Sequence, residues 1–367
     1  MRLRPLAAGA ALAAVLGLVG GCATGPIPEP TPTTRQLGDG SPDRRPALSD
    51  RALAALVDPA LPGCSAAVGV EGGIAWANAA GLADLATGSP VTVDTRFDMA
   101  SVTKQFTATV ILQLADEGAI ALSDTVAAHV AGMPAWAETT TLEQLLHHTS
   151  HIRDYYQAIQ FDWGLGFADY VSHADMLRAI ADLPTLEPGE GFLYSNSNYV
   201  LLAEVIQRVT GQTYPEALDA RIFAPLGLEM VAGPNLKADD VAVSYDDDLN
   251  RQDSGWSGYG AVGIFSTPTQ LALWGDQYRA GGLVSPAALE GAVPEPDGTF
   301  YAAGIEIQPD GSLAHLGRFG GHITTFRVSA DRATTVVVMC NGHSSNREGL
   351  FDALWGIWVQ APAAGAA

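Results

Sequence analysis

The pattern of hydrophobic and polar positions places strand-like segments near both ends of the chain and helical segments in its middle. Within 64–82, two apolar stretches flank Glu71-Gly72-Gly73, which predicts two strands joined by a tight turn. Within 101–122 the apolar residues recur at helical spacing, and Gly118 provides a C-terminal stop. Further helices are predicted at 47–57, 140–147, 173–182, 196–210, 214–224 and 347–359, and further strands at 260–266, 302–307, 323–329 and 334–340.

This order of elements predicts an α+β fold with two lobes. Segments 47–100 and 255–362 carry the strands, so we expect both to contribute to one antiparallel sheet in a domain that spans 47–362. Segment 101–254 is mostly helical, and we expect it to form a lobe inserted between the two halves of the sheet. The terminal helices then cover the sheet.

Composition and charge narrow the classes of partner. The chain has 367 residues, enough for a large core, and its formal net charge is −21 at a sequence pI of about 4.5. Nucleic acid and anionic membrane surfaces repel a protein of this charge, so neither is an expected partner. The charge does not argue against small neutral or amide-like molecules as substrates.

The first residues are typical of an export signal. Arg2 and Arg4 precede an apolar stretch, 6–20, that is too short to span a bilayer. We therefore predict a signal peptide over 1–21, with a short membrane anchor as the alternative.

The segment after the apolar stretch indicates lipid anchoring. Val19-Gly20-Gly21-Cys22 resembles the lipobox of bacterial lipoproteins, in which the cysteine is lipidated and becomes the mature N-terminus. Residues 22–46 are rich in Pro, Thr, Gly and Asp, which predicts a disordered tether. We expect an exported protein that is lipid-anchored to the bacterial cell envelope at Cys22.

Two further cysteines, Cys64 and Cys340, remain in a chain that is expected to leave the reducing cytoplasm. An exported chain can bridge such a pair, but free cysteines are also commonly buried as separate thiols. From the residues alone, both arrangements stay open.

The scarcity of lysine draws attention to one serine. The chain has two lysines, Lys104 and Lys237, against seventeen arginines. A buried lysine can lose its proton and act as a base, whereas a guanidinium cannot. Lys104 follows Ser101 by three residues at the start of a predicted helix, so both side chains lie on one helix face. Because Ser-x-x-Lys also arises by chance, the motif needs companions.

Two later triplets supply chemistry that complements a serine and a lysine. Tyr194-Ser195-Asn196 offers a phenol that can shuttle a proton and an amide that can hold a substrate amide. His315-Leu316-Gly317 offers an imidazole and a turn at which a backbone N–H can be presented. Taken singly, each triplet is equally typical of turn, cap or strand-edge residues. Their joint order is what carries the interpretation.

Together these motifs resemble those of the class C β-lactamase, DD-peptidase and esterase group of serine hydrolases. The resemblance runs from about residue 49 to 358. It implies a β-lactamase/transpeptidase-like fold, with an antiparallel five-stranded sheet, flanking terminal helices and an inserted helical lobe. The segments that carry it are FDMASVTKQFTATVILQLADEGAIALSD, TLEQLLHHTSHIRDYY, PGEGFLYSNSNYVLLAEVIQRVTG, GYGAVGIFSTPTQLALW and HLGRFGGHITTFRVSADRATTVVVMCN.

The resemblance implies a role for each matching side chain in acyl transfer. Ser101 would attack the acyl carbonyl and form a covalent acyl-enzyme, with Lys104 as base or proton relay. Tyr194 would act as a phenolate-like base and deliver a proton to the leaving group. His315 occupies the position where β-lactamases mostly carry lysine and many esterase or peptidase relatives carry histidine.

The resemblance also implies the groups that bind the substrate. Asn196 would hydrogen-bond the substrate amide, and the backbone N–H groups of Ser101 and Arg318, next to Gly317, would form the oxyanion hole. No cofactor and no metal are implied. In this family the first strand lies antiparallel to the last, so a disulfide between Cys64 and Cys340 is one possible arrangement.

Three histidines depart from the family pattern. His315 is a weaker partner than lysine for a substrate carboxylate, which favours esterase or D-amino-acid peptidase activity over β-lactamase activity. His151 and His322 stand where the family usually has a glycine and a large aromatic residue, and both could face the cleft. His147 and His151 have the spacing of a zinc-binding pair, but no glutamate follows the first histidine, which argues against a metal site.

The sequence therefore predicts a serine acyl-hydrolase that cleaves small ester, amide or peptide substrates. A β-lactamase or DD-carboxypeptidase is one alternative, and a non-catalytic penicillin-recognising lipoprotein is an alternative of another class. Four aromatic residues of the predicted cleft loops can serve either substrate contact or loop packing: Tyr155, Tyr156, Trp163 and Trp256.

Overall fold

The computed structural model describes residues 43–183, 191–233, 240–252, 254–279, 281–342 and 346–360. The chain divides into the units Met1–Asp43 and Arg44–Ala367, and the fold below is that of the second unit. The predicted signal peptide, the lipidation site Cys22 and most of the predicted tether lie outside the described residues. Within the described residues, no helix has the length and apolar character needed to cross a membrane.

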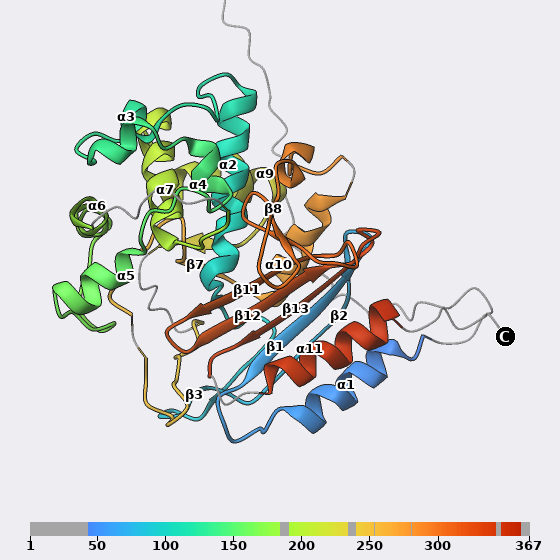
Figure 1. The fold of residues 1–367 in the computed structure, drawn as a ribbon. Coiled ribbons are helices and arrows are strands. Elements are labelled where there is room, and N and C mark those ends of the chain that lie inside the picture. Colours follow the sequence, from blue (N-terminus) through green and yellow to red (C-terminus); the bar gives the residue numbers. More distant parts are fainter. Residues whose placement is uncertain are drawn as a thin grey trace, which may run out of the picture. The chain divides into compact units, whose positions relative to one another are not determined.

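An antiparallel sheet joins the two ends of this unit (Figure 1). Within the described residues it has eight strands in the order β2-β1-β13-β12-β11-β10-β9-β8. Five are long: β1 Cys64–Val70, β2 Gly73–Ala80, β11 Leu313–Phe319, β12 His322–Val328 and β13 Thr334–Cys340. Three are short and extend one edge: β8 Val293–Pro294, β9 Phe300–Tyr301 and β10 Glu306–Ile307. Smaller sheets contain β3 Leu82–Asp84 with β4 Ser89–Pro90, and β5 Phe97–Asp98, β6 Val231–Ala232 and β7 Ile264–Ser266.

The prediction of a five-stranded sheet is wrong, since the sheet has eight strands. The additional strands β8, β9 and β10 have two residues each, too few to show the alternation by which a strand is recognised, and the strand predicted at 302–307 covers only β10 among them. The hydrophobic pattern also missed β11, although this strand is long. Its buried face carries His315 and Gly317 between Leu313 and Phe319, and these two residues hide the apolar alternation.

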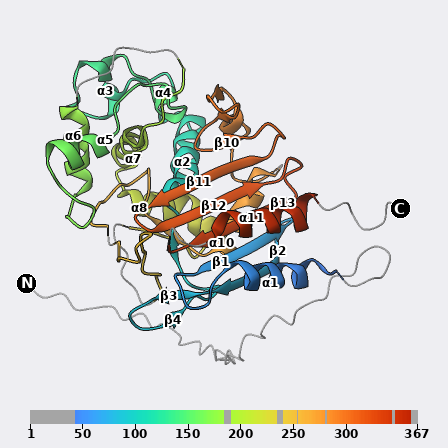
Figure 2. The same cartoon turned by 60° about the horizontal axis from the view of Figure 1, so that its bottom comes forward.

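Helices cover both faces of the sheet (Figure 2). The terminal helices α1 Arg45–Leu56 and α11 Arg347–Trp355 lie side by side on one face and enclose a small core of their own. On the other face, α10 Pro268–Gly275 packs on β1 and β13. The helical lobe contains α2 Lys104–Asp116, α3 Val126–His129, α4 Leu142–Leu146, α5 Tyr155–Gln157, α6 His173–Asp182, α7 Asn196–Thr210, α8 Tyr214–Leu218 and α9 Ala224–Leu226.

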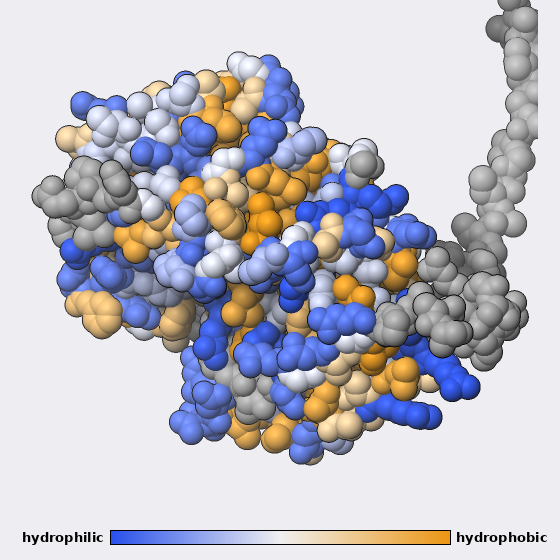
Figure 3. Space-filling model, turned by 45° about the vertical axis from the view of Figure 1, so that its right-hand side comes forward, coloured by the Kyte–Doolittle hydropathy of each residue, from blue (hydrophilic) through white to orange (hydrophobic). Residues whose placement is uncertain are grey.

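The predicted helices agree with this arrangement, with some changes at their ends. The bounds of α6 and α7 match the predicted 173–182 and 196–210. The helix predicted over 101–122 is a 3-10 helix, Ala100–Thr103, followed by α2, which ends just before Gly118 at a φ of 72°. The main core lies between the sheet and the helical lobe. The face in Figure 3 mixes hydrophilic and hydrophobic side chains.

A disulfide joins Cys64 at the start of β1 to Cys340 at the end of β13. The two cysteines are direct partners in the antiparallel register, and both are fully buried. Of the two arrangements that the residues left open, the structure has the bridged one.

Replacing both cysteines by alanine should destabilise the domain. The bridge closes a loop across 276 residues of sequence, so its removal frees the unfolded chain and should lower the free energy of unfolding by about 2–5 kcal/mol. Denaturant unfolding of Cys64→Ala/Cys340→Ala against the unreduced wild type measures this. An unchanged unfolding midpoint, or two reactive thiols in the unfolded and unreduced wild type, would contradict the bridge.

The sheet also meets the helical lobe at one very close contact. Gly317 of β11 lies against the backbone before the 3-10 helix, so a Cβ added to it would stand 2.2 Å from the carbonyl oxygen of Met99. No side chain fits there unless the strand moves. Gly317 therefore allows β11 to lie directly beside the turn that carries Ser101.

Gly317→Ala should displace β11 from that turn and reduce the hydrolytic activity that the sequence predicts by at least about tenfold, because catalytic geometry tolerates little displacement. Gly356→Ala is a matched control, since Gly356 has a helical φ of −60° and nothing lies within 4 Å of an added Cβ. Steady-state kinetics and melting temperatures of the two variants provide the comparison. Equal activity of both variants would mean that the close contact has no role.

Candidate active site

Ser101 lies in the 3-10 helix directly before α2, on a turn that is held from two sides. Ala100, just before it, has a positive φ of 50°, which a residue with a side chain seldom adopts. The Asp98 carboxylate accepts hydrogen bonds from the backbone N–H groups of Ala100, at 2.8 Å, and of Gly263, at 3.2 Å. Burial raises the pKa of Asp98 to about 6, against the opposing effect of these hydrogen bonds. Asp98 thus ties the serine turn to the loop before β7.

Lys104, the first residue of α2, places its amino group beside Ser101. Its Nζ lies 3.1 Å from Ser101 Oγ, 2.8 Å from Asn196 Oδ1 and 3.1 Å from the Ala261 carbonyl oxygen. The side chain is fully buried. Burial lowers the pKa of Lys104 to about 7, although the Asp154 carboxylate acts in the opposite direction. At neutral pH a substantial fraction of this amine is therefore unprotonated.

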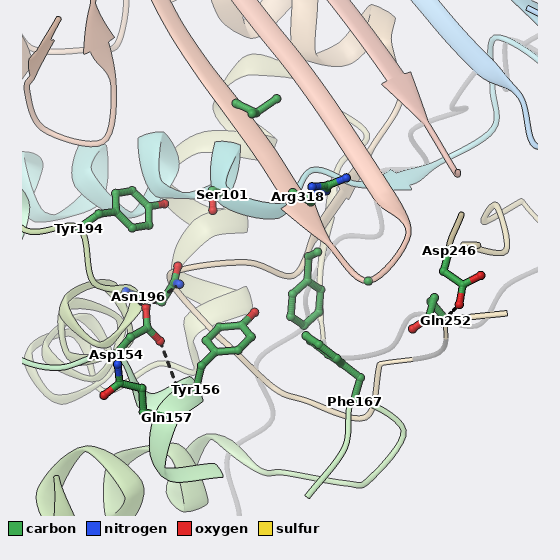
Figure 4. Close-up of a pocket in the computed structure, with 13 residues that line it drawn as sticks. Ser101, Asp154, Tyr156, Gln157, Phe167, Tyr194, Asn196, Asp246, Gln252 and Arg318 are labelled. Carbon is green, nitrogen blue, oxygen red and sulfur yellow. Dashed lines mark hydrogen bonds between the residues drawn. The ribbon is translucent and has the colours of Figure 1, made fainter. Parts of the chain in front are cut away.

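Tyr194 closes the site over the same amino group. Its ring centre lies 5.0 Å from Lys104 Nζ, and its hydroxyl points toward Ser101 (Figure 4). Burial raises the pKa of Tyr194 well above its usual value, while a hydrogen bond with Ser101 lowers it. The side chain is therefore a neutral phenol in the free protein, which suits a proton donor better than a phenolate-like base.

Asn196, the first residue of α7, bridges two titratable groups. Its Oδ1 accepts from Lys104 Nζ, while its Nδ2 and its backbone N–H both donate to Asp154 Oδ2 at 2.8 Å. The second Asp154 oxygen accepts from Tyr156 N at 3.1 Å and caps the short helix α5. Burial raises the pKa of Asp154, and the hydrogen bonds together with Lys104 lower it. Asn196 lines the pocket, but these contacts already orient its carboxamide.

His315 lies behind the site and is neutral. It is 2% exposed, its Nδ1 lies 2.8 Å from the Leu316 carbonyl oxygen, and its Nε2 lies 3.1 Å from the Tyr301 hydroxyl. Because a carbonyl can only accept, Nδ1 carries the proton and Nε2 accepts from Tyr301. Burial and the neighbouring Lys104 lower the pKa of His315 to about 3. The structure brings His315 close to Lys104 but not to the surface of the pocket.

A pocket of about 770 Å³ opens over Ser101. Its walls combine aromatic side chains with carboxylates and amides, and Arg318 at the end of β11 lies opposite the helical lobe (Figure 4). The lining residues are Ser101, Asp154, Tyr156, Gln157, Phe167, Tyr194, Asn196, Asp246, Gln252, Leu316, Arg318, Phe319 and Gly320. The structure therefore brings five of the predicted site residues to one place: Ser101, Lys104, Tyr194, Asn196 and Arg318.

Of the four aromatic residues in the predicted cleft loops, some are placed for substrate contact and others for packing within the protein. Tyr156 lines the Ser101 pocket, whereas Tyr155 and Trp256 are buried in the core. Trp163 lines a separate pocket of about 320 Å³ on the helical lobe. Only Tyr156 among the four is placed to touch a substrate at Ser101.

The histidines outside the third motif serve the structure around the site. His148 is buried, and its Nδ1 accepts hydrogen bonds from Ser195 N and Asn198 Nδ2. These hydrogen bonds tie the segment after α4 to the start of α7. His151 has a positive φ of 56°, which explains why glycine is usual at this position. Neither His151 nor His322 lines the Ser101 pocket.

Within the described ranges of the chain, no cluster of three or more His, Cys, Asp or Glu side chains has an arrangement that could hold a metal ion.

Sequence reasoning missed three polar residues of the site, of which Asp98 and Tyr301 are buried and Asp154 is half-buried. Asp98 stands three positions before Ser101, Asp154 lies in a segment singled out only by resemblance, and Tyr301 lies in a two-residue strand. The one available signal is the position of Asp154 before a short helix, where aspartate is typical of an N-cap. That signal predicts capping and does not reveal the contact with Asn196, which lies 42 residues later.

Known proteins show the same fold and related sequences. Among curated proteins, the chain is 30% identical over 332 residues to a D-aminopeptidase of Cereibacter sphaeroides, which covers 81% of this chain and 60% of the relative. It is 33% identical over 207 residues to esterase EstB of Burkholderia gladioli, covering 53% and 52%. It is 34% identical over 167 residues to penicillin-binding protein 4* of Bacillus subtilis, covering 43% and 35%. The chain thus spans between 35% and 60% of the length of these relatives.

Two solved structures share the fold over most of this chain. One is a D-stereospecific amidohydrolase from Streptomyces sp., with a TM-score of 0.72 and 24% identity, covering 86% of this chain and 99% of that one. The other is the D-amino acid amidase from Ochrobactrum anthropi SV3, with a TM-score of 0.69 and 22% identity, covering 85% and 96%. At these identities the likeness shows the fold.

The family described as Beta-lactamase matches residues 49–356, which include every part of the site around Ser101. This chain belongs to the β-lactamase family.

Proposed function

We propose that the protein is a serine acyl-hydrolase that works through a covalent acyl-enzyme on Ser101. The observation that carries this proposal is the buried Lys104 amino group, 3.1 Å from Ser101 Oγ, with a pKa lowered to about 7. An amine with this pKa can accept a proton at neutral pH, which ordinary lysine cannot. Two of the relatives are a D-aminopeptidase and esterase EstB, which supports the hydrolysis of small amides or esters.

The geometry supports the following course for the reaction. Ser101 Oγ bonds to the acyl carbon while its proton passes to Lys104 Nζ, and the carbonyl electrons move to the oxygen. Backbone N–H groups of Ser101 and Arg318 stabilise that oxyanion. The bond to the leaving group breaks as Tyr194 donates its proton to that group and regains one from Lys104. A water molecule then bonds to the acyl carbon, and the bond from that carbon to Ser101 Oγ breaks. The proton that the water loses passes through Lys104 to Ser101 Oγ, and the acid product leaves.

The charges around the pocket indicate the class of substrate. His315 has a pKa of about 3 and is uncharged at neutral pH, so it offers no cation to a substrate carboxylate. The lining carries two carboxylates, Asp154 and Asp246, and the exposed Arg318. We therefore place small esters and D-amino-acid amides or peptides ahead of β-lactams and D-alanine-terminated peptides. In the latter two, a carboxylate stands directly beside the nitrogen of the amide that is cleaved.

β-Lactamase or DD-carboxypeptidase activity is the second candidate, and Arg318 is the group that favours it. A non-catalytic penicillin-recognising lipoprotein is the candidate of another class. Burying a lysine is energetically costly, because the ammonium group loses its contact with water or its proton. A binding module has no need for such a residue, whereas Lys104 is fully buried beside the serine. This arrangement favours catalysis.

We also propose that the protein is exported and lipid-anchored through Cys22. The support is the charged and apolar start of the chain, the lipobox-like Val19-Gly20-Gly21-Cys22, and the composition of 22–46. A lipid anchor followed by a tether would hold the hydrolase at the bacterial envelope. Nucleic acid is not an expected partner, because the net charge is −21.

A fluorophosphonate probe should label Ser101 at a rate that rises as the pH increases through about 7, since unprotonated Lys104 is the base. Mass spectrometry of the labelled peptide measures this rate. Ser101→Ala should not be labelled, and Lys104→Arg should react at least about a hundredfold more slowly because arginine stays protonated. An unlabelled wild type would favour the non-catalytic binder, and a rate independent of pH would exclude Lys104 as the base.

The protein should hydrolyse a p-nitrophenyl ester faster than nitrocefin, by at least about tenfold in kcat/KM, because the β-lactam carboxylate lacks a cation at the third motif. Rates measured with Ser101→Ala provide the background for both substrates. Comparable turnover of nitrocefin would instead support a β-lactamase, with Arg318 as the group that binds the carboxylate.

A further inference from the structure

Three hydrogen-bonding neighbours surround the buried amino group of Lys104, and their chemistry determines where its lone pair can point. Ser101 Oγ, Asn196 Oδ1 and the Ala261 carbonyl oxygen lie at 3.1, 2.8 and 3.1 Å. An ammonium group has three N–H bonds and can donate to all three neighbours. A neutral amine has two N–H bonds and one lone pair, so one neighbour must then donate to it.

The Ala261 carbonyl can only accept, so the choice lies between Ser101 and Asn196. A carboxamide is nearly symmetric in shape, and Asn196 could present either its oxygen or its NH₂ group to Lys104. If it presented the NH₂ group, the lone pair of Lys104 would be occupied by Asn196. Ser101 would then have no base.

Asp154 removes this ambiguity. Its Oδ2 accepts hydrogen bonds from both the backbone N–H and the Nδ2 of Asn196, each at 2.8 Å. Asp154 and Asn196 lie side by side at the pocket (Figure 4). Every hydrogen bond described for the Asp154 carboxyl group is donated to it, including the one from Tyr156 N. The NH₂ end of Asn196 must therefore face Asp154, and the oxygen end must face Lys104.

We propose that Asp154 is a positioning residue for acylation: by holding the Asn196 carboxamide in one orientation, it directs the lone pair of neutral Lys104 onto the Ser101 hydroxyl. The inference rests on the proposed function, because it needs Lys104 to act as a base. Asp154 itself stays off the reacting atoms and acts through Asn196.

The same carboxylate acts on Lys104 through its charge. It raises the pKa of Lys104, so its neutralisation should lower that pKa further. The histidines and tyrosines that face these two residues are uncharged at neutral pH, because burial lowers the pKa values of the histidines and raises those of the tyrosines. Asp98, Asp246 and Arg318 are the other charged side chains described around the pocket. His148, Tyr194, Tyr199 and His315 face Lys104, and Tyr155, Tyr156 and Tyr194 face Asp154.

The variant Asp154→Asn tests the positioning role of Asp154 separately from its role as the cap of α5. Asparagine caps helices about as well as aspartate, so α5 should keep its cap, but its own NH₂ group allows the Asn196 carboxamide to turn over. With a p-nitrophenyl ester, the plateau value of kcat should fall at least about tenfold. The rising limb of the pH profile should move to lower pH by about half a unit. A variant that is merely less well folded would lose kcat without moving the limb.

A double-mutant cycle tests whether Asp154 acts through Asn196. If it does, Asp154→Asn combined with Asn196→Ala should be no slower than Asn196→Ala alone, because the orienting contact is already gone. Asp310→Asn is the matched control: Asp310 pairs with Arg327 away from the pocket, and its activity and pH profile should stay within about twofold of wild type.

The outcomes separate this inference from the proposed function. If wild type is labelled at Ser101 while Asp154→Asn keeps its plateau kcat, the inference is wrong and the hydrolase stands. A shifted limb with unchanged kcat would leave Asp154 with an effect of charge alone, and additive losses in the cycle would rule out action through Asn196. An unlabelled wild type would overturn both.

Discussion

The burial of one lysine amino group is the constraint on which the rest of the site depends. Lys104 is fully buried, and taking an ammonium ion out of water is costly unless it is paired or loses its proton. Its direct neighbours are a hydroxyl, an amide oxygen and a backbone carbonyl, all of them uncharged. This cost lowers the pKa of Lys104 to about 7. At neutral pH the amine can therefore act as a base for Ser101 instead of remaining a permanent cation.

Close backbone packing maintains this burial. A Cβ at Gly304 would lie 2.6 Å from the Lys104 carbonyl oxygen, and one at Gly260 would lie 2.0 Å from that of Tyr199. Both glycines also have a positive φ. Glycine is therefore favoured at each position for two reasons, the lack of space for a Cβ and the backbone conformation. Together with Gly317 beside the serine turn, these glycines let neighbouring segments pack closely around Lys104, whose side chain is fully buried. The sheet and the lobe are thus parts of one catalytic scaffold.

Features that depend on local sequence could be predicted, and features that depend on distant contacts could not. The bounds of α6 and α7 follow from helical periodicity, and the proximity of Ser101 and Lys104 follows from one helical turn. The two-residue strands β8, β9 and β10 are too short to show a periodicity of their own, and β10 pairs with the edge of β11.

The same distinction applies to the polar residues that orient the site. Asp154 reaches Asn196 across 42 residues of sequence, and Tyr301 of β9 contacts His315 of β11, although β10 lies between these two strands in the sheet. The spacing of residues along the sequence does not predict such contacts. The neutrality of His315 likewise depends on its burial, which a motif cannot show.

The pKa of Lys104 tests the account most directly, and the composition of the chain makes it measurable. With only two lysines, Lys104 and Lys237, a Lys237→Arg variant labelled with ¹³C at lysine Cε should give a single lysine signal. The account predicts that this signal titrates at about pH 7. Titration at the usual lysine value, roughly 10.4, would show a permanently charged amine and contradict the proposed base.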